Sequence, residues 1–106
     1  MRVLFDQGTP APLRQLLLDH EVETAYERGW SSLQNGELIA AAEATGFTVF
    51  VTTDRNLKYQ QNLAARRMAI VVLLTTSWPR IKAGSAPVVT AVNASLPGGY
   101  VEVAIP

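Results

Sequence analysis

The sequence has 106 residues, of which 48% are hydrophobic and 17% are charged, and it contains no cysteine. This length and composition predict a single domain over residues 1–106, and they exclude a disulfide framework, a thiolate metal site and a cysteine nucleophile. The longest apolar run, residues 68–74, is too short to span a membrane, and no signal segment precedes the first strand pattern. We therefore expect a cytoplasmic protein without a membrane partner.

The net charge of zero hides an asymmetry between the two halves of the chain. Residues 1–54 carry three cations against eight acids, a net charge of −5, and residues 55–106 carry six cations against one acid, a net charge of +5. Such asymmetry can mark an anionic partner for the basic half, but cations that solvate helix faces explain it at least as well.

Five runs have the apolar or alternating pattern of β-strands: residues 2–5, 21–25, 47–52, 69–74 and 100–105. The run 69–74 is apolar throughout, as in a strand that is covered on both faces. The run 21–25 alternates polar and apolar residues, which is typical of an exposed edge strand.

Helical patterns separate these strands, at residues 10–19, 35–45, 56–67 and from 77 onward, with a new start near Pro87. Thr9 and Asn35 have the residue types of N-caps, and Gly46 stands where a C-cap glycine belongs. Strands that alternate with helices predict an α/β fold, in which a mostly parallel sheet of about five strands is wrapped by helices.

Three acids are predicted to meet at one end of this sheet. Asp6 follows the first strand, Asp54 follows the third, and Glu37 begins the helix that leads into the third strand. Ligands of open α/β sheets bind at the carboxyl ends of the strands, where the strand order reverses. Carboxylates that converge there need a cation or a shared proton, and their oxygens suit Mg²⁺ or Mn²⁺.

Each acid also has a plainer interpretation. Asp54 can simply cap the helix behind it, Asp6 can bond to the turn that follows it, and Glu37 is favoured by the helix dipole. The residues after Asp54 add cations and amides that can hold a phosphate backbone, namely Arg55, Asn56, Lys58 and Gln61.

Four blocks of the sequence resemble the PIN-domain superfamily, in particular a short PIN-like branch of bacterial proteins. They are "MRVLFDQ" (1–7), "HEVETAYERGW" (20–30), "NGELIAAAEATGFTVFVTTDRNL" (35–57) and "YQQNL" (59–63). The resemblance implies a three-layer α/β/α sandwich and a ribonuclease that hydrolyses RNA with metal-activated water, often the toxin of a toxin–antitoxin pair. It also implies Asp6, Glu37 and Asp54 as the metal-binding and catalytic acids.

The sequence departs from the pattern of this family at two positions. Gln7 stands where the branch often has Glu, and Asn56 stands where other PIN-like proteins have a further Asp. A second acid of the longer PIN nucleases has no counterpart. With three acids in place of four, we expect one weakly bound Mg²⁺ or Mn²⁺.

Two functions therefore stay open. The first is a Mg²⁺- or Mn²⁺-dependent ribonuclease with RNA as substrate and a cognate antitoxin as partner. The second is a weak or inactive PIN-like module that binds RNA or a protein without cutting, for which Arg66 and Arg67 would supply salt-sensitive affinity. The predicted sheet edges, 21–25 and 100–105, also suggest a homodimer, because an uncovered edge can pair with another chain.

Overall fold

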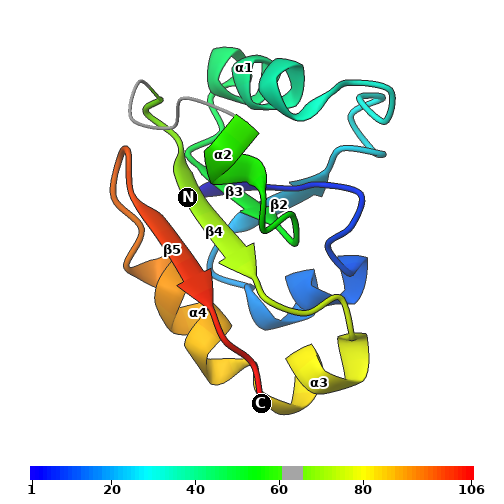
Figure 1. Cartoon of the computed structure of the whole chain (residues 1–106), viewed down its shortest axis with the longest axis vertical. Helices are drawn as coiled ribbons and strands as arrows, with labels where there is room; N and C mark the ends of the chain where they lie inside the picture. Colours follow the sequence, from blue (N-terminus) through cyan, green and yellow to red (C-terminus); the bar gives the residue numbers. More distant parts are fainter. Residues whose placement is uncertain (61–65) are drawn as a thin grey trace.

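A five-stranded, fully parallel β-sheet forms the centre of the molecule (Figure 1), whose computed structural model describes residues 1–60 and 66–106. The strands are β1 (Arg2–Phe5), β2 (Glu21–Thr24), β3 (Val49–Thr52), β4 (Ala69–Leu73) and β5 (Tyr100–Val103). They lie in the order β2-β1-β3-β4-β5, so that β2 and β5 form the two edges. The predicted α/β class with a parallel sheet of about five strands is confirmed.

Helical segments cover both faces of the sheet and make it the middle of three layers. They are η1 (Ala11–Leu16, a 3₁₀ helix), α1 (Asn35–Thr45), α2 (Leu57–Gln60), α3 (Trp78–Ala83) and α4 (Ala86–Asn93). The α1 and α2 helices pack on one face, whereas η1, α3 and α4 pack on the other. Within the described ranges, no helix has the length and apolar character needed to cross a membrane.

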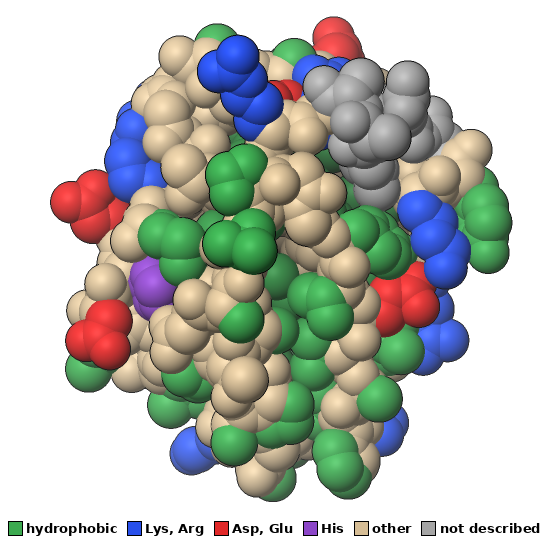
Figure 2. Space-filling view, turned by 90° about the vertical axis from the view of Figure 1, so that its left-hand side faces the viewer, with side chains coloured by type: hydrophobic (Ala, Val, Ile, Leu, Met, Phe, Trp, Pro, Cys, Tyr) green, Lys and Arg blue, Asp and Glu red, His purple; other side chains and the backbone are tan. Residues whose placement is uncertain are grey.

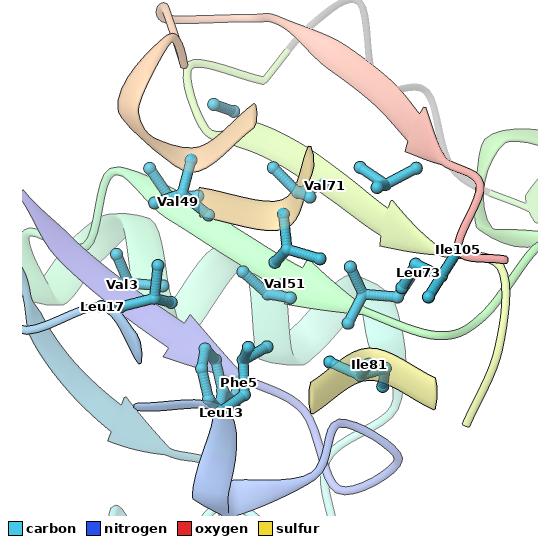
Figure 3. Close-up of a cluster of buried hydrophobic side chains, with 14 residues drawn as sticks. Val3, Phe5, Leu13, Leu17, Val49, Val51, Val71, Leu73, Ile81 and Ile105 are labelled. Atoms are coloured by element: carbon cyan, nitrogen blue, oxygen red, sulfur yellow. The ribbon is translucent and has the colours of Figure 1, made fainter. Parts of the chain in front are cut away.

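The alternation of side chains along each strand divides the interior into two cores. Val49 and Val51 of β3 point into the core beneath η1, α3 and α4, which Figure 3 shows. Phe50, between them, points into the core beneath α1 and α2. All five residues of β4 are buried, as its continuous apolar sequence predicts for a strand that is covered on both faces.

The structure differs from the sequence expectation where helices begin. The N-cap of η1 is Pro10 instead of Thr9, and η1 is a short 3₁₀ helix that ends at Leu16. The N-cap of α1 is Gln34, and Asn35 is already the first helical residue. In both cases the expected cap residue turns its side chain toward the carboxyl end of the sheet.

Two further expectations concern where helices end. Gly46 is the C-cap of α1, with a left-handed φ of 95°, as predicted. The helix expected over 56–67 is described only as α2, since residues 61–65 lie outside the described ranges, and Arg66 and Arg67 precede β4 without helical structure.

Candidate functional site

The order of the strands reverses between β1 and β3. From β1 the chain first moves outward to β2 and then crosses back to β3, which pairs with the other side of β1. Asp6 directly follows β1, and Asp54 lies two residues beyond β3. Both acids therefore stand at the carboxyl ends of neighbouring parallel strands, where open α/β sheets bind their ligands. The pairing of β1 with β3 meets the condition under which the sequence places these two acids side by side.

The Asp6 carboxylate is held by two threonines. Its Oδ1 accepts hydrogen bonds from the Thr9 backbone N–H at 3.1 Å and from the Thr9 hydroxyl at 2.7 Å, and its Oδ2 accepts one from the Thr52 hydroxyl. Burial raises the pKa of Asp6 above its ordinary value, the charge of Asp54 adds to the increase, and the hydrogen bonds from the two threonines oppose it.

The Asp54 carboxylate is fixed by two amide donors. Its Oδ1 accepts from the Asn56 backbone N–H at 2.9 Å, and its Oδ2 accepts from the Asn35 side chain at 2.7 Å. The first contact is a local turn that precedes α2 and not the helix cap that the plainer interpretation of Asp54 expected, because α2 begins only at Leu57. The second contact comes from the start of α1, nineteen residues away in sequence, and a local cap does not explain it.

The Thr52 hydroxyl connects the two acids. It donates to Asp6 and accepts a hydrogen bond of 3.0 Å from the backbone N–H of Asp54. Thr52 is fully buried at the end of β3, so this hydroxyl has one fixed pair of partners. The Asp6 carboxylate is therefore linked through Thr52 to the backbone of Asp54, although the two acids follow different strands.

Glu37 is placed differently from the other two acids. It lies in the first turn of α1 and is exposed, and its Oε1 accepts from the Gln34 backbone N–H at 3.1 Å as part of a capping box. Across residues 1–60 and 66–106, no three His, Cys, Asp or Glu side chains lie close enough to hold one metal ion. The structure thus brings Asp6 and Asp54 together, whereas the role of Glu37 stays a prediction.

The residues expected to contact RNA are bound mostly by their own chain. The Arg55 guanidinium donates to the Leu74 carbonyl at 2.7 Å, and Lys58 pairs with Glu102 of β5 at 3.0 Å. Asn56 contributes its backbone N–H to Asp54. Gln61, the fourth predicted contact, lies outside the described residues.

Two hollows open beside Asp6. A small one of about 120 Å³ lies toward α1 and is lined by Asp6, Trp30 and Asn35 among others. A larger one of about 660 Å³ lies toward η1 and β2, where Tyr26 and the ion pair between Arg14 and Glu27 are part of its wall. Asp6 is therefore part of the wall of both hollows.

The donor set fits a hard divalent cation. Mg²⁺ is usually bound through one or two carboxylates, while water and substrate phosphates complete its shell. Asp6 and Asp54 supply two carboxylates, and hydroxyl and amide donors orient their oxygens. A cation between the acids would also relieve the repulsion that contributes to the raised pKa of Asp6.

Three residues that orient the two carboxylates are not predicted as site residues from the sequence. The sequence predicts helix caps at Thr9 and Asn35, and it predicts only a strand at Thr52. The feature of the sequence that could identify them is their position, because each lies near the end of the sheet that carries an acid.

Comparison of the chain with protein-family models, with curated proteins and with solved structures gives no match. The fold and the geometry of the site therefore rest on the structure itself, and membership of the PIN-like family stays a prediction from the sequence.

Proposed function

We propose that this chain is a Mg²⁺- or Mn²⁺-dependent ribonuclease of PIN-like type, and that it is the toxin of a toxin–antitoxin pair. The observation that carries the nuclease proposal is the pair Asp6 and Asp54, which lie at the point where the strand order reverses and share Thr52. The toxin role and a cognate antitoxin rest on the sequence resemblance alone.

In this proposal the chain's own residues hold and orient the cation. Asp6 and Asp54 bind it, Thr9 and Thr52 fix the rotamer of Asp6, and Asn35 fixes that of Asp54. A divalent cation here would supply an activated water and offset the charge of the phosphodiester. Glu37 remains the proposed third acid, which the sequence resemblance supports.

A Mn²⁺ titration followed by thermal unfolding tests the proposal. We expect Mn²⁺ to raise the Tm of the parent protein but not that of Asp54→Asn, because the substitution removes one of the anionic ligands. Asp19→Asn is the matched control, since Asp19 is an exposed acid in the turn before β2. The parent and the control should cleave RNA in Mn²⁺, whereas Asp54→Asn should lose at least a hundredfold of this activity. Equal cleavage by all three proteins would refute the proposed site.

A second function is supported by specific contacts. Glu37 is part of a capping box, Arg55 bonds to Leu74, and Lys58 bonds to Glu102. These contacts occupy the third acid and two cations of the proposed nuclease site, which favours a module that binds without cutting. In the same assays, this module would bind RNA without Mn²⁺-dependent cleavage. Its affinity would fall with salt and on neutralising Arg66 and Arg67.

A further inference from the structure

The outer side of β5 is an open sheet edge. The Gly99 carbonyl accepts a hydrogen bond from Ile70 of β4, and the Val103 carbonyl accepts one from Leu74, just after β4. Because backbone groups alternate in direction along a strand, those of Tyr100 and Glu102 face away from β4. No strand of the described chain lies beyond β5, so these donors and acceptors are available to another strand.

An apolar surface continues from this edge onto α4. Two adjoining hollows, of about 400 and 240 Å³, lie along β5 and α4 and share Ala91, Ala94 and Val101 in their walls. Val101 is 40% exposed, and Leu96, between α4 and β5, is 72% exposed. Figure 2 shows this side of the molecule, with hydrophobic side chains along its middle and charged side chains mostly toward its periphery.

The opposite edge of the sheet has a different character. The β2 strand carries Glu21 and Glu23, which pair with Arg2, and Glu23 also pairs with Arg28. Charged side chains on an edge strand oppose pairing with another chain. A head-to-tail contact of β5 with β2 of another copy would in addition close only if the rotation between copies completed a ring. The β5 edge carries one charged side chain, Glu102, against two on β2, and is therefore better matched by a second β5.

We propose that two copies of this chain form a closed dimer, in which β5 of one copy pairs antiparallel with β5 of the other. The two sheets then join into one of ten strands, and the α4 helices of the two copies lie beside each other on one face. The small side chains of Ala91 and Ala94 leave room for this approach. The inference does not depend on the proposed nuclease activity.

The sequence of β5 selects the register of this pairing. In an antiparallel pair, residues whose backbone groups face outward must lie opposite outward-facing residues of the partner strand. With most of β5 overlapping, this condition allows a twofold axis at Val101 or at Glu102. An axis at Glu102 would set two carboxylates directly opposite each other, which is unfavourable. An axis at Val101 instead buries two valines against each other and places the Tyr100 hydroxyl of one copy across from Glu102 of the other.

Cysteine cross-linking tests both the partner and the register, because the chain has no cysteine of its own. At an axis through Val101 the two Cα atoms lie about 4.5 Å apart, within the range that a disulfide spans. Val101→Cys should therefore form a covalent dimer under mild oxidation. Ala104→Cys is the matched control, since Ala104 is exposed one residue after β5 but lies about 20 Å from its copy in this register.

The mass in solution provides the second measurement. We expect a species of twice 11.5 kDa for the parent. Val101→Lys should convert it to monomer by placing two cations at the axis, whereas Leu18→Lys, at a leucine that is 81% exposed after η1, should remain dimeric. A monomeric parent, a dimer that persists in Val101→Lys, or equal cross-linking at positions 101 and 104 would each overturn the proposal.

Discussion

At the scale of single residues, the protonation of Asp6 connects the site to stability. Its pKa is raised in the folded protein, mainly by burial, so folding favours the protonated form. The folded state then binds more protons than the unfolded state between the ordinary pKa of 3.8 and the raised value. The contribution of Asp6 to stability is therefore greatest below pH 3.8 and is lost as the pH rises through the raised pKa.

Urea unfolding of the parent and of Asp6→Asn in metal-free buffer, at several pH values from 3.5 to about 7.5, measures this contribution. The free energy of unfolding of the parent, relative to Asp6→Asn, should decrease as the pH rises, because only the parent ionises at this position. A difference that stays constant or increases with pH would show that burial does not dominate the pKa of Asp6.

The residue scale also shows why the sequence revealed only part of the site. The positions of Asp6 and Asp54 could be predicted because both acids follow strands, and strand ends meet at one side of a parallel sheet. Thr9 and Asn35 could not be told from helix caps, since a cap and a site that orients a carboxylate require the same side chains. Their contacts depend on how η1 and α1 pack on the sheet.

At the scale of elements, the end of α1 offers a sharp test. Gly46 has φ of 95°, and the backbone N–H of Phe47 reaches back to the Ala42 carbonyl. An alanine in this conformation costs about 1–2 kcal/mol. Its Cβ would also lie 3.1 Å from the Arg2 guanidinium, which would have to move.

Gly46→Ala should therefore lower the free energy of unfolding by about 1–2 kcal/mol in urea titrations. Gly46→Asn should lose less, because asparagine adopts the left-handed conformation more readily. If the two variants were equally stable, the left-handed cap would not limit the stability of α1.

The sequence predicts the strands well, because a run of several apolar or alternating residues defines each of them. The five strands lie within one or two residues of their apolar or alternating runs, and Gly46 marks the end of α1 as expected. The sequence overestimates the length of the first helix, because Pro10 and the leucines after it are compatible with a 3₁₀ helix as well as with an α-helix. The choice between the two depends on packing against β1, which the local sequence does not encode.

At the scale of the whole molecule, one sheet is shared by two cores. Trp30 packs on the core beneath α1, where its ring meets that of Phe47 edge-on, and Trp78 packs on the core beneath α3 and α4. Each tryptophan is thus a fluorescent probe of one face, and the chain has only these two. Because adjacent residues of each strand support opposite cores, neither core can be lost while the sheet stays intact.

Single-tryptophan proteins, Trp30→Phe and Trp78→Phe, should therefore unfold in urea with one transition each, at closely similar midpoints when the protein concentration is held fixed. Adding Phe50→Ala truncates a fully buried ring in the α1 core and should cost about 3–5 kcal/mol. The loss should appear equally in both backgrounds, although Trp78 lies on the other face. A shift confined to the Trp30 signal would mean that the α1 layer unfolds separately, and that the sheet does not couple the two cores.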